Sequence, residues 1–448
     1  MQEQDWRLLE SLAPGVTARG RDERYWLDRS AEVIALSTQD RSLYPVMDHS
    51  RGEGTSLFDL AGNEYLDFTS GVAVRALGIR YAPLVEFERE ISSVVEELPG
   101  QDFDHIPQVL LAEKLIEISP GDFAKQVFFT TSGARAVETA VKAAIDNTGR
   151  TRFVAFRPSF HGRTGYALSL TSSKAVHREG FPQTLPVARA PYAYCYRCPL
   201  SKSPDSCGIE CADQVLEVVE REGKDVAAIV VEPISGEGGI VVPHSGFIPR
   251  LREIADHLGA WLIVDEVQSG LGRTGRWWAV DHFGVVPDVI CTAKALGAGW
   301  PLGAAIGRRP LFTRGSRHSE TFSAEPRQAL LSLFILKEIE RRGYLANAER
   351  MGQILLDGLR ELARTHDCVG EARGLGLMCG IEIVDGSRTR TASPAKRAAV
   401  LKAAVQVERL LLLGAGECSI RLLPPLNVTE GEIHDALSRL DRALTTVA

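Results

Sequence analysis

Short runs of consecutive apolar residues alternate with amphipathic segments through the middle of the chain. The apolar runs cover residues 127–130, 153–156, 226–231, 261–264 and 289–290. Segments with helical periodicity, such as 248–257, lie between them. A strand that is apolar at every position must be covered on both faces, as happens when helices pack on either side of a parallel sheet. The pattern therefore predicts an α/β fold whose large, mainly parallel sheet is flanked by helices.

The two ends of the chain have a different pattern. Residues 57–67 alternate around an Ala-Gly-Asn turn and predict a hairpin. After about residue 325 we expect a long helix over 328–341, followed by a smaller α+β segment with one strand over 374–384. We predict four parts: a helical N-terminal extension (1–45), the N-terminal part of a small domain with a linker (46–100), a large domain (101–327) and a C-terminal small domain (328–448).

Lys294 and Asp265 are the most informative residues, because each follows an apolar run that predicts a buried strand. A buried lysine is costly unless it is paired, neutralised or used covalently. Lysine forms a Schiff base with a carbonyl cofactor and can then shuttle protons. A carboxylate can keep a pyridine nitrogen protonated, which makes the ring an electron sink. Asp265 could instead cap a helix, but together the two residues suggest pyridoxal 5'-phosphate.

Several further motifs occur in a fixed order along the chain. They are Ser132-Gly-Ala134, Phe160-His-Gly-Arg-Thr164, Glu232-Pro-Ile-Ser-Gly-Glu-Gly-Gly239, Asp265-Glu-Val-Gln268, Gly270-Leu-Gly-Arg-Thr-Gly275, Lys294, Arg373-Gly-Leu-Gly376 and Arg421-Leu-Leu-Pro-Pro-Leu426. From about residue 45 to 440 the chain resembles the class III aminotransferases (ornithine/4-aminobutyrate type) of pyridoxal-phosphate fold type I. The resemblance implies a large domain with a sheet of the seven-stranded type, a smaller α+β domain built from both termini, and a homodimer with a shared active site.

The resemblance also implies a set of cofactor contacts. The turn at Ser132 would bind the phosphate at a helix N-terminus. Phe160 and Val267 would lie on the two ring faces, and Gln268 would face the phenolic oxygen; a core Phe and a polar loop residue are the plainer interpretations of Phe160 and Gln268. The full predicted set is Ser132, Gly133, Ala134, Phe160, His161, Glu232, Asp265, Val267, Gln268, Lys294 and Thr321, with Thr321 reaching the phosphate of the neighbouring subunit.

The resemblance assigns substrate binding to Arg163, Glu237 and Arg421, and we add Val72 as a residue near the pocket. Arg421 would bind the α-carboxylate of an amino acid or 2-oxo acid, and Glu237 would pair with it when the donor lacks that group. Arg163 would bind a distal carboxylate. Structural salt bridges are the alternative for all three charged residues.

Some positions depart from the family pattern. Arg135 stands where the family has Glu, Ser235 replaces a common Gln, and the stretches 78–83 and 321–326 lack usual residues. Arg135 would either bind a second substrate anion or lie exposed on its helix. The function that follows is an aminotransferase that moves an amino group from an amine, amino acid or amino sugar to a 2-oxo acid. Epimerisation, racemisation or elimination, for example on an amino sugar of an antibiotic pathway, is the alternative.

Four of the eight cysteines cluster at Cys195, Cys198, Cys207 and Cys211. They could be free thiols or ligands of a structural zinc ion or iron–sulfur cluster. The net charge of −7 does not indicate a nucleic-acid surface. No apolar run approaches the length of a membrane span, and the charged start lacks a signal-peptide core, so we expect a cytoplasmic protein.

Overall fold

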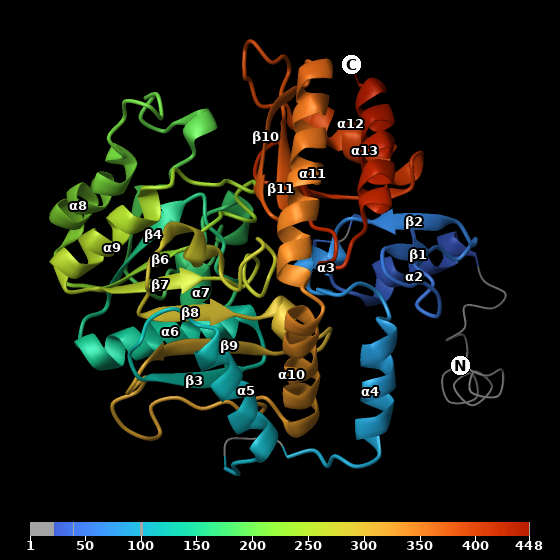
Figure 1. Cartoon of the computed structure of the whole chain (residues 1–448). Helices are drawn as coiled ribbons and strands as arrows, with labels where there is room; N and C mark the ends of the chain where they lie inside the picture. Colours follow the sequence, from blue (N-terminus) through green and yellow to red (C-terminus); the bar gives the residue numbers. More distant parts are fainter. Residues whose placement is uncertain (1–21, 39, 99–101, 448) are drawn as a thin grey trace.

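A seven-stranded sheet forms the centre of the computed structural model, which describes residues 22–38, 40–98 and 102–447 (Figure 1). The strand order is β3-β9-β8-β7-β6-β4-β5. Neighbours from β5 to β8 are parallel, whereas β9 runs antiparallel to both β8 and β3. The predicted mainly parallel sheet is thus confirmed. The strands are β3 Lys125–Thr130, β4 Arg152–Arg157, β5 Val187–Pro191, β6 Val226–Val231, β7 Trp261–Asp265, β8 Val289–Thr292 and β9 Gly303–Arg308.

Helices cover both faces of this sheet, as the uninterrupted apolar runs require. Successive side chains of a strand point to opposite faces. In β4, Phe153 and Ala155 pack with the buried alanines of α6 (Gly133–Thr148), while Val154 and Phe156 pack in the cluster that contains α8 (Glu210–Glu222) and α9 (Phe247–Leu258). The apolar side chains of β4 therefore contribute alternately to two separate cores.

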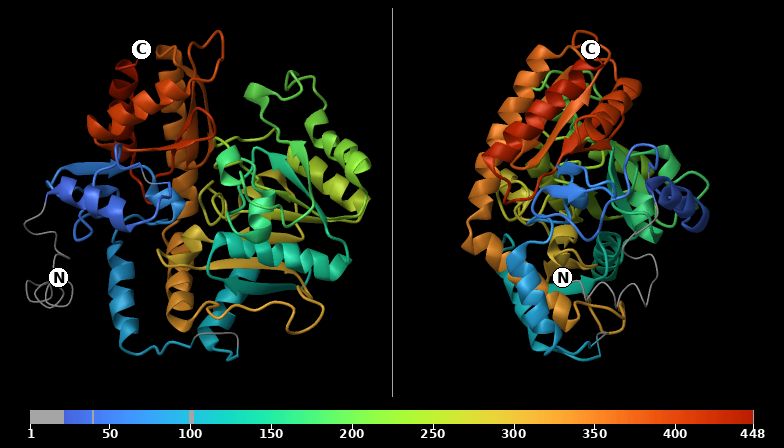
Figure 2. Two further views of the ribbon diagram at one scale, coloured as in Figure 1. Left: turned by 180° about the vertical axis from the view of Figure 1, so that it is seen from behind. Right: turned by 90° about the vertical axis from the view of Figure 1, so that its right-hand side faces the viewer.

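Two small sheets accompany the large one, and the first of them joins the two ends of the chain. The first, in the order β1-β2-β12, contains the predicted hairpin, in which β1 (Ser56–Phe58) pairs antiparallel with β2 (Glu64–Asp67). Strand β12 (Leu410–Leu411) pairs parallel with β2. Figure 2 shows these N-terminal strands beside the C-terminal helices. The second sheet has the order β10-β11-β14-β13, with β14 at Ser419–Leu422 and β13 at Leu413–Ala415.

The prediction of one strand over 374–384 is wrong. Strand β10 (Val369–Leu375) ends there, and β11 (Met378–Ile383) returns antiparallel to it. Gly376 makes the turn with a φ of +52°, and an added Cβ would collide with the Thr274 backbone. A left-handed residue in such close contact requires glycine. The chain therefore reverses at Gly376, although the apolar pattern continues through it and suggested a single strand.

The remaining helices surround these sheets, and none in the described part of the chain has the length and apolar character needed to cross a membrane. Within the predicted N-terminal extension the structure describes α2 (Glu23–Val33), while residues 1–21 lie outside the described residues. The other helices are α3 Ser70–Ala73, α4 Ala82–Ser92, α5 Ile106–Glu117, α7 Gly165–Leu170, α10 Pro326–Arg341, α11 Tyr344–Thr365, α12 Pro394–Gln406 and α13 Glu430–Thr445.

Gly352 tests how α11 packs on the β10–β11 turn. Alanine is normally favoured over glycine inside a helix by about 1 kcal/mol, but a Cβ at Gly352 would collide with the backbone of Gly376. We expect Gly352→Ala to destabilise the fold by about 1–3 kcal/mol through overpacking and to lower the melting temperature. Gly431→Ala, whose Cβ would meet open space in α13, is the control. A melting temperature for Gly352→Ala at or above the wild-type value would contradict this packing.

Candidate active site

A cavity of about 500 Å³ opens where the parallel strands end. Open α/β sheets bind ligands at this edge, beyond the carboxyl ends of the strands. Asp265 is the last residue of β7, and Lys294 lies two residues after Thr292, the last residue of β8. The predicted residues that line the cavity are Ser132, Gly133, Ala134, Phe160, His161, Arg163, Glu232, Glu237, Asp265, Val267, Gln268 and Lys294. Val72, Thr321 and Arg421 are not among the lining residues.

The N-terminus of α6 forms one wall of the cavity. Ser132 is its N-cap, and the Ser132 side chain accepts a hydrogen bond from Arg135 N at 3.4 Å. A Cβ on Gly133 would lie 2.7 Å from Val267 Cγ1, and one on Gly303 would lie 2.6 Å from Ser132 O. The two glycines thus keep the backbone close to its neighbours. Free amide groups of the first helical turn can hold a phosphate there.

Asp265 is fixed from two sides. Its Oδ2 lies 2.8 Å from His161 Nδ1, and its Oδ1 accepts a hydrogen bond from Val267 N at 3.0 Å. Both the Asp265 and His161 side chains are buried. His161 Nε2 and Gln268 Oε1 are buried without a hydrogen-bond partner. Buried polar atoms are normally paired, so these two lining residues fit a polar ligand in the cavity.

Glu232 connects two loops of the cavity. Its Oε2 accepts a hydrogen bond from Phe160 N at 2.9 Å, and its Oε1 accepts one from Gly236 N at 3.0 Å. Burial raises the pKa of Glu232 to about 7, with Asp265 adding to the rise and His161 opposing it. Glu232 therefore positions the segment before His161 and the loop that carries Glu237.

Lys294 has an unusual backbone and an unusual pKa. Its φ of +43° lies in the left-handed region, which is strained for a residue other than glycine. Burial lowers the pKa of Lys294 to about 8, and Arg421 lowers it further, while Asp265 and Glu232 oppose the effect. A lower pKa leaves more of the amine neutral and nucleophilic near neutral pH.

The α3 turn is a second strained segment beside the cavity. Ser70, Gly71, Val72 and Ala73 all have positive φ values between 46° and 64°. Val74, which follows them, lines the cavity, whereas the predicted Val72 does not. Consecutive left-handed residues are rare outside functional segments, and the sequence Ser-Gly-Val-Ala gave no signal of them beyond its single glycine.

Glu237 lies between two cations. Its Oε2 is 2.9 Å from Arg421 Nη1, and its Oε1 is 3.0 Å from Lys174 Nζ. Burial tends to raise the pKa of Glu237, but Arg421 and Lys174 outweigh it and lower the pKa. The predicted pair of Glu237 and Arg421 is thus brought together, and Lys174 is a partner that the sequence did not indicate. The sequence offers only one hint of a role for Lys174, namely that lysine is uncommon in this chain: 10 of the 51 basic residues are lysines.

Arg163 lines the mouth of the cavity rather than its floor. Its guanidinium carbon lies 5.8 Å from the centre of the Phe160 ring, and its Nη2 lies 3.2 Å from His177 Nε2. The rings of His177 and Phe160 meet edge to face at 5.7 Å. His177, also missed from the sequence, therefore packs against two lining residues.

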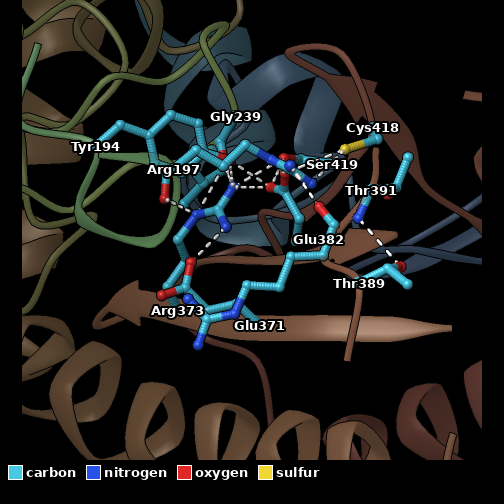
Figure 3. A network of polar contacts seen from close by, with 12 residues as sticks. Tyr194, Arg197, Gly239, Glu371, Arg373, Glu382, Thr389, Thr391, Cys418 and Ser419 are labelled. Atoms are coloured by element: carbon cyan, nitrogen blue, oxygen red, sulfur yellow. Dashed lines mark hydrogen bonds and ion pairs between the residues drawn. The ribbon is translucent and has the colours of Figure 1, made fainter. Parts of the chain in front are cut away.

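A buried ion-pair network supports the loop that carries Glu237 (Figure 3). Arg373 Nη2 lies 2.7 Å from Glu382 Oε2 and donates to Gly239 O at 2.6 Å and to Ser419 Oγ at 2.8 Å. Arg197 pairs with the other oxygen of Glu382 at 2.6 Å. Burial would raise the pKa of Glu382, but Arg373 and its other partners lower it to about 2.

Arg135 does not extend the predicted anion site. Its side chain is partly exposed and pairs with Glu138 Oε2 at 3.0 Å and with Glu320 Oε1 at 2.6 Å. Two carboxylates from the same chain thus neutralise its charge. A second substrate anion would have to compete with both.

The clustered cysteines Cys195, Cys198, Cys207 and Cys211 are free thiols that line one small cavity. Among the residues that the structure describes, no group of three or more His, Cys, Asp or Glu side chains is arranged to hold a metal ion. The predicted zinc or iron–sulfur site is therefore not supported. The thiol of Cys207 instead points to the carbonyl oxygen of Pro204 at 3.7 Å.

The pKa of Lys294 predicts a cost in stability. Because the folded state holds this pKa near 8, below the ordinary 10.5, protonation opposes folding fully below pH 8 and progressively less as pH rises to 10.5. We expect Lys294→Met to stabilise the ligand-free protein by roughly 1–3 kcal/mol at pH 7 and by little near pH 10. Urea denaturation of the two proteins at both pH values measures the difference. Lys402→Met, on the exposed side of α12, is the control; a gain from Lys294→Met that does not change with pH would argue against this origin.

Comparisons with known proteins match this architecture. The family model of class III aminotransferases matches residues 37–444. The leucine/methionine racemase of Thermococcus litoralis is 33% identical, covering 89% of this chain and 90% of the relative. A probable 4-aminobutyrate aminotransferase of Bacillus subtilis is 35% identical, covering 88% and 92%.

The fold and the family agree. A crystal structure of a Bacillus anthracis aminotransferase superposes with a TM-score of 0.86 at 27% identity, covering 94% of this chain and 98% of that one. The family match spans both small sheets, the central sheet and the cavity at its edge. The chain therefore belongs to the class III aminotransferases and is a pyridoxal-phosphate-dependent enzyme.

Proposed function

We propose that the enzyme transfers an amino group from a small-molecule donor to a 2-oxo acid in the cavity around Lys294. The observation that carries the proposal is the placement of Lys294 and Asp265 on neighbouring strand ends, with the pKa of the lysine lowered to about 8. Pyridoxal phosphate, when bound, supplies a carbonyl group for Lys294 and an electron sink for the reaction. Lys294 Nζ is the group that holds and moves the proton.

The other lining residues fit the cofactor. We assign the phosphate to the amides that follow Ser132 at the start of α6. The carboxylate of Asp265, held in place by His161, serves the ring nitrogen. Phe160 and Val267 lie against the ring, and Gln268 Oε1, which has no partner in the described chain, points to a polar group on it.

Glu237 and Arg421 support two classes of donor. While Glu237 pairs with Arg421, the cavity suits an ω-amine that has no α-carboxylate. When Glu237 leaves, Arg421 can bind the α-carboxylate of glutamate or 2-oxoglutarate. Arg421 Nε and Nη1 lack well-aligned hydrogen bonds despite the 2.9 Å ion pair, which leaves donors for a substrate carboxylate. Arg163 at the cavity mouth serves a distal carboxylate.

We further propose a homodimer that completes the site. Large apolar side chains that include Phe103, Ile106, Trp300 and Phe322 are about half exposed or more, and exposed apolar surface of this kind is typical of subunit interfaces. Trp300 also lines the cavity, and Phe322 follows Thr321. A second copy over this surface would bring its Thr321 to the phosphate end of the cavity.

Racemisation is the second candidate, because the relative from Thermococcus litoralis is a racemase of leucine and methionine. The same lysine and aspartate would serve it, since both reactions begin by removing a proton next to the amino group. The two functions differ in stoichiometry, because transamination alone consumes a 2-oxo acid.

A half-reaction screen tests the proposal. Holoenzyme is mixed with 4-aminobutyrate, glutamate, leucine or an amino sugar, and the visible absorbance of the cofactor is followed. We expect a donor to abolish the absorbance and 2-oxoglutarate to restore it. Lys294→Ala should lose the lysine-bound absorbance and the turnover together, because no other lysine lines the cavity in the described chain. Change of the donor's handedness without consumption of 2-oxoglutarate would establish racemisation instead.

Glu237→Gln tests the two donor classes. Without its negative charge, residue 237 no longer neutralises Arg421, so an unpaired buried cation faces the ω-amine. We expect kcat/KM for 4-aminobutyrate to fall by about 10- to 100-fold and that for glutamate to fall less or to rise. Equal losses for the two donors would contradict the pairing.

A further inference from the structure

We propose that Lys174 is a positioning residue that holds Glu237 when Arg421 is taken by a substrate carboxylate. Lys174 thereby sets the balance between donors with and without an α-carboxylate. The inference rests on the proposed function and adds a residue that neither the motifs nor the family resemblance assigned.

The two cations that hold Glu237 differ in their surroundings. The Arg421 side chain is 7% exposed, whereas the Lys174 side chain is 41% exposed. Each cation faces a different oxygen of Glu237, Oε2 toward Arg421 and Oε1 toward Lys174. The carboxylate can therefore lose one partner and keep the other.

The backbone around Glu237 is fixed, so only the side chain can adjust. Glu237 O accepts a hydrogen bond from Gly416 N at 2.7 Å. On either side, Gly236 N donates to Glu232 and Gly239 O accepts from Arg373. Rotation of the side chain away from Arg421 thus keeps Glu237 within reach of Lys174.

Lys174 is held in place by the segment that lines the cavity. The preceding residues Ser172 and Ser173 both donate their amides to Ser159 O at 2.8 Å. After it, His177 packs edge to face on Phe160 and lies 3.2 Å from Arg163. Contacts on both sides fix the backbone of Lys174, so the ordering of its side chain costs less than for a free surface lysine.

The two states of Glu237 differ in which charged groups they leave unpaired. The Glu237 side chain is 16% exposed. If a carboxylate that is this buried loses its only cationic partner, nothing compensates the free energy of removing it from water. With Lys174 present, Glu237 keeps a partner when a substrate carboxylate displaces it from Arg421. Without Lys174, Glu237 depends on Arg421 alone, so the paired state is favoured and α-carboxylates must compete harder.

The test compares Lys174→Gln with wild type in the holoenzyme. We expect kcat/KM for glutamate to fall about three- to tenfold, through KM rather than kcat, and that for 4-aminobutyrate to fall less. The dissociation constant of glutarate, an unreactive dicarboxylate, should rise by a similar factor in calorimetry. Lys174→Arg should restore both values. Lys202→Gln is the matched control, because Lys202 is 44% exposed and pairs with Glu210 at 2.7 Å rather than with Glu237.

The double variant Lys174→Gln/Glu237→Gln distinguishes a role of Lys174 through Glu237 from direct action of Lys174 on the substrate. If Lys174 acts through Glu237, Lys174→Gln has no further effect once the carboxylate is gone. An undiminished loss in that background would overturn the proposal, because Lys174 would then contact the substrate directly or attract it by charge. Equal losses for both donors in the single variant would also overturn it. A wild-type enzyme that binds glutarate but converts neither donor would instead refute the proposed function, and the glutarate measurements would still decide the role of Lys174.

Discussion

The buried ion pair of Arg373 and Glu382 is the constraint on which the substrate side of the site depends. It joins the loop after Glu237, through Gly239 O, to the sheet whose β14 carries Arg421. The two side chains are 8% and 1% exposed, so removing one would leave the other charged and unpaired in the interior. The distance between Glu237 and Arg421 is therefore set by a contact between the central sheet's loops and the small sheet, and not by either residue alone.

The cavity gathers charges that a folded protein normally avoids burying. Burial and the charge of Arg421 lower the pKa of Lys294, while the carboxylates of Asp265, Glu232 and Glu237 oppose that effect. Backbone strain adds to the cost at Lys294 and in the left-handed turn before Val74. The stability lost here is recovered in the two dense apolar cores on either face of the sheet, which is the usual distribution between a functional site and its scaffold.

The sequence predicted the features that depend on local pattern. The apolar strands of the parallel sheet and the hairpin at β1 and β2 follow from periodicity and turn residues. The candidate site residues came from the resemblance to the family, and most of them line one cavity. The sequence did not predict what depends on close tertiary contact. Strand β9, Gly303-Ala-Ala-Ile-Gly-Arg308, has too few large apolar residues to give a signal in the sequence. A Cβ on Gly303 would lie 2.6 Å from Ser132 O, so this close tertiary contact excludes larger residues there. Lys174 belongs to no motif and gains its meaning only from the position of Glu237.

The arrangement around Glu237 also bears on the choice between transamination and racemisation. A racemase binds an amino acid whose α-carboxylate is the same before and after the reaction, so a carboxylate that covers Arg421 would only oppose binding. An aminotransferase binds two substrates in turn, and these can differ in whether they carry that group. A glutamate shared between a buried arginine and a partly exposed lysine is useful when the site must alternate between substrates with and without that group. The lysine and aspartate serve either reaction, and the charged side chains beyond them favour transamination.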